Sequence, residues 1–216
     1  CNGHGTHVAG VLGGARFGVA KRVRLVAVRV LDCAGGGPVG RVVAGLRWVI
    51  ADHAAGQPAV ANLSLGGAPS SEVDAAVRDL VHDGVTVVAA AGNGDGAGHG
   101  VDACSTSPAR TRIAITVSAT GRDDRRAPWA DFGRCVDLFA PGVGIASDWA
   151  TGDHATRTLS GTSMAAPHVA GAAAVYLSTH PAAAPTSVRA ALVRAATTGV
   201  VIDARTDPAR LLHTGG

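Results

Sequence analysis

Short runs of β-branched and other apolar residues alternate along this chain with segments of helical spacing. The strand candidates are residues 23–30, 60–65, 85–91, 113–119 and 136–140. The helix candidates are residues 39–54, 71–82 and 185–196, with a short helix within residues 2–12 and a longer apolar helix that starts near residue 162. Strands that alternate with helices in this way favour a doubly wound, mostly parallel α/β sheet flanked by helices.

Length and composition limit the other possibilities. At 216 residues the chain suits one domain over residues 1–216 with a full core, which must be packed from Val, Ala, Leu and Ile because aromatic residues make up only 3%. The net charge of +3 is small and the basic residues are scattered, so no nucleic-acid partner is expected. No apolar run reaches the roughly 18 residues of a transmembrane helix, so no membrane partner is expected either.

Ser163 stands among small residues in the run SGTSMAAPH, residues 160–168, just before the longest apolar segment. Since residues 169–177 carry almost no polar group, they predict a buried helix that starts near Ser163. A helix start offers free backbone N–H groups and the positive end of the dipole, which suit a nucleophile whose reaction forms an oxyanion. The alternative is that Ser163 is only a helix N-cap.

Three separated motifs point to one family. They are NGHGTHVAG from residue 2, AAGN from residue 90 and GTSMAAPHVAG from residue 161. In this order they resemble the subtilisin-like serine proteases, and nearly the whole chain is similar to the proteinase K branch, closest to its aqualysin-type members. The resemblance implies a subtilisin-like fold and a secreted, extracellular serine endopeptidase. It also implies a protein or peptide substrate and an inhibitory propeptide in the full-length protein. We expect a monomer.

The resemblance gives roles to the polar residues of these motifs. Ser163 matches the nucleophile, His4 matches the histidine that takes its proton, and Asn93 matches the amide of the oxyanion hole, helped by the Ser163 N–H. His7 and His168 match positions that make structural hydrogen bonds. A metal site at His4 and His7 is a weak alternative, because no glutamate lies between them.

The resemblance also implies how a substrate is held. Two backbone edges should clamp an extended peptide, and small residues should line the main side-chain pocket. The edges are Gly35, Gly36 and Gly37 together with Ser64, Leu65 and Gly66, and the pocket residues are Ala90, Ala91 and Gly92. No cofactor is expected for catalysis, but a structural calcium site is implied at Asp137, with carbonyl oxygens near Arg112 and Ala114.

The 4 cysteines lack the C-x-x-C spacing of zinc or redox sites. Their spacing alone leaves three disulfide connectivities open. Pairing of nearest neighbours, Cys1 with Cys33 and Cys104 with Cys135, would close two loops of about 30 residues, each worth about 3–4 kcal/mol. Aqualysin-like relatives share that pairing, and oxidised cysteines would indicate an exported protein.

One residue of the family pattern has no match. The family's catalytic aspartate precedes the histidine by tens of residues, whereas this sequence begins just before His4. Asp32 follows the histidine and lacks the next glycine, so we expect a turn role for it. The chain is therefore expected to be an N-terminally truncated piece that is nearly inactive alone, since the aspartate contributes about 10⁴ to turnover.

Two alternatives to a protease stay open. The chain could serve as a non-catalytic binding or scaffold module, although retention of His4, Asn93 and Ser163 argues against that role. An esterase could use the same nucleophile, but the G-x-S-x-G motif of the α/β-hydrolases does not occur around Ser163.

Overall fold

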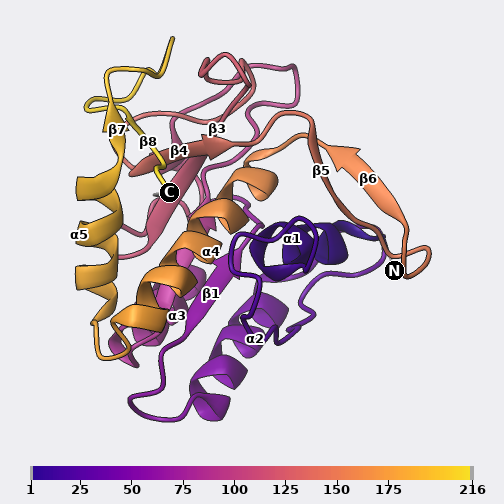
Figure 1. Ribbon diagram of the computed structural model, residues 1–216, viewed down its shortest axis with the longest axis vertical. Helices are drawn as coiled ribbons and strands as arrows, with labels where there is room; N and C mark the ends of the chain where they lie inside the picture. Colours follow the sequence, from indigo (N-terminus) through magenta and orange to yellow (C-terminus); the bar gives the residue numbers. More distant parts are fainter. Residues whose placement is uncertain (1, 215–216) are drawn as a thin grey trace.

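A six-stranded sheet with helices on both faces forms the centre of the computed structural model, which describes residues 2–214 (Figure 1). Its strand order is β1-β2-β3-β4-β8-β7. The strands β1, β2, β3, β4 and β8 run parallel, and β7 is antiparallel to β8. The predicted doubly wound, mostly parallel α/β fold is confirmed. The strands are β1 (Val60–Leu63), β2 (Thr86–Ala90), β3 (Ile115–Thr120), β4 (Leu138–Pro141), β7 (Thr197–Thr198) and β8 (Arg210–Leu211).

Helices cover both faces because the strands are apolar on both. Side chains along a strand alternate between faces, so Val88 of β2 packs in the cluster with α4 and α5, while Val87 packs in the cluster with α2 and α3. Figure 1 shows α4 and α5 in front of the sheet and α3 behind it. The helices are α1 (His4–Gly13), α2 (Val39–Asp52), α3 (Ser71–His82), α4 (Thr162–Thr179) and α5 (Pro185–Ala195), with a 3-10 helix η1 (Ala103–Ser105). None of those within residues 2–214 combines the length and apolar character needed to cross a membrane.

Most predicted elements occur within a few residues of their expected bounds, and α3 matches its prediction at both ends. Five short elements were missed, among them η1 and β7. The antiparallel hairpin of β5 (Ile145–Asp148) and β6 (Thr156–Leu159) projects from the body in Figure 1, and its second strand is polar and largely exposed. Strand β8 lies in a segment that we expected to be only a surface return, because two residues leave no periodicity to detect.

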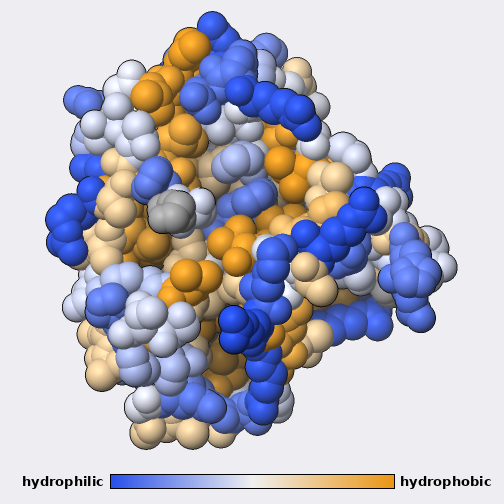
Figure 2. Space-filling model, in the orientation of Figure 1, coloured by the Kyte–Doolittle hydropathy of each residue, from blue (hydrophilic) through white to orange (hydrophobic). Residues whose placement is uncertain are grey.

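The strand predicted at residues 23–30 is wrong. This segment pairs with no strand among the described residues, although its composition suits a strand. It lines a cleft of about 2060 Å³ together with the edge strand β1, and Leu25 and Val26 are 46% and 51% exposed. β-branched residues favour a strand only where a neighbour supplies hydrogen bonds and packing, and here none does. Figure 2 shows hydrophobic surface in a hollow of this face of the molecule, with hydrophilic side chains on either side.

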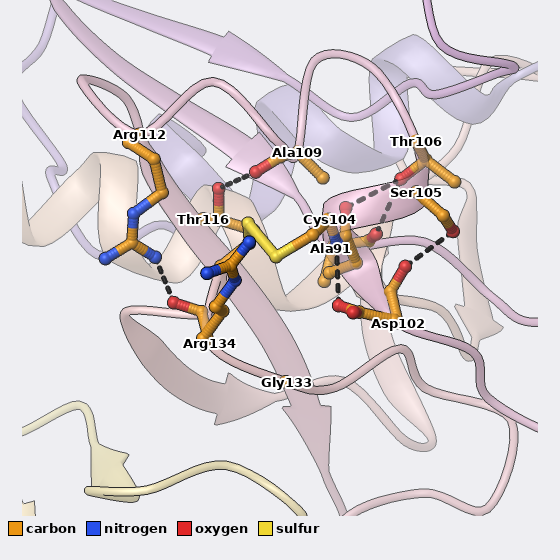
Figure 3. The surroundings of a disulfide bond; sticks show 12 residues. Ala91, Asp102, Cys104, Ser105, Thr106, Ala109, Arg112, Thr116, Gly133 and Arg134 are labelled. Atoms are coloured by element: carbon orange, nitrogen blue, oxygen red, sulfur yellow. Dashed lines mark hydrogen bonds between the residues drawn. A yellow bond between two sulfur atoms is a disulfide. The ribbon is translucent and has the colours of Figure 1, made fainter.

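A disulfide joins η1 to the loop before β4 (Figure 3). Cys104 and Cys135 have Cα atoms 5.3 Å apart and close a loop with a sequence separation of 31. This half of the predicted pairing is confirmed. The other half involves Cys1, which lies outside the described residues, so a bridge between Cys1 and Cys33 stays a prediction.

The packing of α4 on α1 depends on a glycine. A Cβ at Gly171 would lie 2.7 Å from Val19 Cβ and 3.0 Å from the Leu12 carbonyl oxygen. We predict that Gly171→Ala lowers the free energy of unfolding by about 1–3 kcal/mol, because the backbone contact must open. The matched control is Gly40→Ala in α2, where a Cβ meets nothing within 4 Å and Ala should be neutral or stabilising. Equal denaturation midpoints for the two variants would contradict this account.

Candidate functional site

Helix α4 begins at Thr162, so Ser163 lies in its first turn, as the sequence predicts. The helix is buried along most of its length, and it contacts β1, β2, β3 and β4. A first-turn N–H has no acceptor within its own helix, so the Ser163 N–H can donate to a ligand. The Ser163 hydroxyl donates a long hydrogen bond of 3.4 Å to the carbonyl oxygen of Ser64.

Pro167 changes the hydrogen bonding of the Ser163 backbone. Because proline has no N–H, the carbonyl of Ser163, four residues earlier, loses its usual helical donor. Ser64 Oγ donates to that carbonyl instead, at 2.7 Å, and accepts from Asn62 Nδ2 at 2.9 Å. The end of β1 is thereby fixed to the first turn of α4.

Asn93, which follows β2, lies beside the same helix start. Its Oδ1 accepts hydrogen bonds from the Thr162 N–H at 2.9 Å and from the Thr162 hydroxyl at 3.0 Å. A Cβ added at Gly161 would lie 3.7 Å from Nδ2, so the amide nitrogen is next to the residue that precedes the helix. With Oδ1 held by Thr162, the Nδ2 group can donate to a ligand. Sequence reasoning missed the role of Thr162, whose only signal was its position next to Ser163.

His4 is the first residue of α1 and lines the same cleft as Ser163. Burial lowers the pKa of His4 below its ordinary value, and the charge of His7 lowers it further. A lowered pKa keeps the imidazole neutral at neutral pH, which is the form that can accept a proton.

The other two histidines of the motifs have the structural roles that we predicted. The His7 side chain is fully buried, and its Nε2 donates to the carbonyls of Ile145 and Arg157, each at 3.0 Å. The bonds tie α1 to the hairpin of β5 and β6. His168 donates from Nδ1 to the Met164 carbonyl at 2.8 Å, within α4.

Both predicted peptide edges line the cleft that contains His4 and Ser163; their residues are Gly35, Gly36, Gly37, Ser64, Leu65 and Gly66. The first edge is shaped by Asp32, whose Oδ1 accepts from the N–H groups of Ala34 at 2.9 Å and Gly36 at 3.0 Å. The predicted turn role of Asp32 is therefore confirmed. Assignment of both edges to a substrate stays a prediction.

The predicted pocket residues are placed differently. Ala90 and Ala91 are 5% and 0% exposed and belong to two core clusters, so neither side chain faces the cleft. Gly92 is half-buried next to Asn93. None of the three lines the cleft that contains His4 and Ser163, and the side-chain pocket stays a prediction.

Asp137, the carboxylate predicted to bind calcium, forms an ion pair with Arg189. Asp137 Oδ2 accepts from the Thr116 N–H at 3.0 Å, and Oδ1 accepts from the Arg189 guanidinium. Near the predicted carbonyl ligands, Ala114 is buried, and the Arg112 side chain is turned toward the Arg134 carbonyl, to which it donates (Figure 3). Both Asp137 oxygens therefore accept hydrogen bonds from protein groups, and the calcium site stays a prediction. Within residues 2–214, no three His, Cys, Asp or Glu side chains gather as a metal site.

The bond from Ser64 to the Ser163 carbonyl gives a prediction about coupling. Ser64→Ala should lower the free energy of unfolding by about 1–2 kcal/mol, because the partly buried Ser163 carbonyl loses its donor. In a Pro167→Ala background, the restored N–H at position 167 can take that carbonyl, so the same substitution should cost much less. Denaturant unfolding of the four proteins of this cycle measures the coupling. Additive effects would show that Ser64 does not replace a helical hydrogen bond.

The ion pair of Asp137 gives a second prediction. Arg189→Met leaves a buried carboxylate unpaired, so the melting temperature should fall, and millimolar calcium should restore part of the loss by binding the freed oxygens. The wild-type protein should gain less from the same calcium. A larger calcium effect on the wild type than on the variant would show that calcium, not Arg189, neutralises Asp137.

Comparison with known proteins agrees with this geometry. The model of the subtilase family matches residues 1–214. An extracellular serine proteinase of Thermus sp. (strain Rt41A) is 54% identical over 215 residues, and alkaline serine exoprotease A of Vibrio alginolyticus is 49% identical over 214 residues. Each alignment covers 99% of this chain but only 51% and 38% of those proteins, so the chain spans about half the length of its relatives or less.

A solved structure gives the same assignment for the fold. The crystal structure of a cold adapted subtilisin-like serine proteinase matches with a TM-score of 0.94 and 45% identity, covering 100% of this chain and 76% of that one. The fold, the family model and the relatives therefore agree: the chain belongs to the subtilase family.

Proposed function

We propose that the protein hydrolyses peptide bonds as a serine endopeptidase, with Ser163 as nucleophile and His4 as general base. One observation carries the proposal: Thr162 holds Oδ1 of Asn93, which leaves Nδ2 as a donor beside the first turn that carries Ser163. A nucleophile next to preoriented N–H donors is the arrangement that acyl transfer needs. Membership of the subtilase family supports the same chemistry.

The proposed reaction has two halves. Ser163 Oγ attacks the scissile carbonyl carbon while His4 takes the hydroxyl proton, and the carbonyl oxygen becomes an oxyanion that accepts from Asn93 Nδ2 and the Ser163 N–H. When the oxyanion collapses, the C–N bond breaks and His4 gives its proton to the leaving amine. Water, deprotonated by His4, then attacks the acyl-enzyme, releases the carboxylic acid product and restores Ser163.

A carboxylate beside His4 is needed to hold its tautomer and stabilise the imidazolium. Among the described residues, burial and His7 shift the pKa of His4 downward, and no carboxylate acts to raise it. We propose that an aspartate in the part of the protein outside this chain supplies that group. The cleft between residues 23–30 and the edge strand β1 supports this, because it is lined by His4 and by a strand with an open edge.

The proposed substrate is an extended peptide. The edges at residues 35–37 and 64–66 line one cleft with His4 and Ser163, and backbone pairing along two edges recognises peptides with broad specificity. Export is proposed because the Thermus relative is named extracellular and because the bridge of Cys104 and Cys135 suits an oxidising compartment. We also propose that the full-length protein carries an inhibitory propeptide and that the protein is a monomer.

Kinetics of the full-length gene product on a peptide substrate test this function. Ser163→Ala should abolish turnover, and Asn93→Ala should lower kcat by about 10² to 10³. Ser187→Ala, on the exposed side of α5, is the matched control and should behave like the wild type. Full activity of the Ser163→Ala protein would contradict the assignment.

The 216-residue chain alone should turn over peptides about 10⁴-fold more slowly than the full-length product, because the histidine lacks its carboxylate. Equal turnover by the two proteins would show that His4 needs no partner from outside this chain. If the full-length protein binds peptides without cleaving them, the scaffold role replaces the enzymatic one.

A further inference from the structure

A buried carboxylate holds the turn that carries Asn93. Asp131 is 1% exposed, and its Oδ1 accepts the Val101 N–H at 2.8 Å. The Gly94 N–H also acts on this carboxylate and lowers its pKa. The N–H of Asp131 donates in turn to the Gly92 carbonyl at 3.1 Å. Asp131 therefore bonds to Gly92 on one side of Asn93, and its carboxylate is influenced by the N–H of Gly94 on the other side.

The carboxylate also packs directly against the turn. Gly92 has φ +118, and a Cβ at this position would lie 2.0 Å from Asp131 Oδ2. Residue 92 must therefore be glycine, and the turn cannot move closer to residue 131. Asp131 is itself fixed to the sheet, because Ser118 Oγ in β3 donates to its carbonyl at 2.6 Å.

Burial of this charge has a cost. Desolvation raises the pKa of Asp131, and the charge of Asp102 adds to the rise, whereas the Val101 and Gly94 N–H groups and Arg126 act in the opposite direction without cancelling it. Because the pKa is raised, folding favours the protonated form, and stability falls as the pH rises through the folded-state pKa. An apolar side chain would avoid this cost, but it could not accept a hydrogen bond from the Val101 N–H.

We propose that Asp131 is a positioning residue, which holds residues 92–94 so that the Asn93 amide points to the oxyanion of the substrate. The proposal rests on the function proposed above. Thr162 fixes the Asn93 side chain from the helix, and Asp131 fixes its backbone from the sheet. Asp131 touches no reacting atom, so its effect on the reaction must pass through Asn93. A displacement of about 1 Å in such a donor can cost up to about 10² in rate.

A double-mutant cycle on the full-length protein tests the proposal. Asp131→Ala removes the acceptor, Asp131→Asn retains one acceptor oxygen, and each is combined with Asn93→Ala. Active sites are counted with a serine-directed phosphonate, so that unfolded protein does not enter kcat. The matched control is Asp102→Ala, because Asp102 also accepts a backbone N–H in this region, from Cys104 at 2.9 Å, but caps η1 instead.

We expect Asp131→Ala to lower kcat about 10-fold or more with KM changed less than about twofold, and Asp131→Asn to recover most of that loss. In the Asn93→Ala background, Asp131→Ala should change kcat less than about twofold. The control should leave kcat per active site unchanged. An equal loss in both backgrounds, or no loss in either, would overturn the proposal.

A failure of the proposed function would give a different pattern of kcat values from a failure of the Asp131 proposal alone. If Asn93→Ala alone leaves kcat unchanged, Asn93 is not an oxyanion donor and both proposals fall. If Asn93→Ala lowers kcat as expected but Asp131→Ala does not, only the role of Asp131 falls.

Discussion

The structure depends on how the first turn of α4 is held against the ends of the strands. The Thr162 N–H and hydroxyl donate to Asn93 after β2, and the Ser163 carbonyl accepts from Ser64 after β1. Parallel strands bring their carboxyl ends to one edge, so two residues that are distant in sequence meet at one helix start. That meeting creates the proposed site, because it brings the Asn93 amide, the Ser163 N–H and the Ser163 hydroxyl to one helix start.

Proline and glycine make this contact possible. Pro167 leaves one helical carbonyl without its donor, and the hydroxyl of Ser64 fills that place. Gly92 allows a carboxylate to lie against the backbone next to Asn93. Pro167 lacks the backbone N–H that a regular helix would use, and Gly92 lacks a side chain. At Pro167 a hydrogen bond from Ser64 replaces the helical one, and at Gly92 a hydrogen bond from the Asp131 N–H joins the turn to residue 131.

Much of the fold could be predicted from the sequence, because its core helices and strands have strong periodicity. Helix α3 matches its prediction at both ends because Ser70 caps it and Glu72 and Asp74 suit its first turn. The strand at residues 23–30 failed for the opposite reason: composition predicts that a segment can pair, not that a partner lies beside it. The hairpin of β5 and β6 was missed because its polar residues give little hydrophobic signal.

For the candidate site, the motif residues could be predicted from the sequence, but the contacts that hold them could not. Ser163, Asn93 and His4 stand in recognisable motifs. Thr162 lies in the same motif as Ser163 and Asp131 lies in none, and the bonds that give these two residues their roles are seen only in the three-dimensional structure. Arg189 could not be related to Asp137 from the sequence, because a cation 52 residues away carries no local signal.

The central claim is that Ser163 is an activated nucleophile, and the position of a covalent adduct tests it most directly. The full-length protein would be treated with a fluorophosphonate and digested, and the modified residue would be found by mass spectrometry. The account predicts one adduct, on Ser163, that is lost in a His4→Ala variant. An adduct on another serine, or no adduct at all, would contradict it.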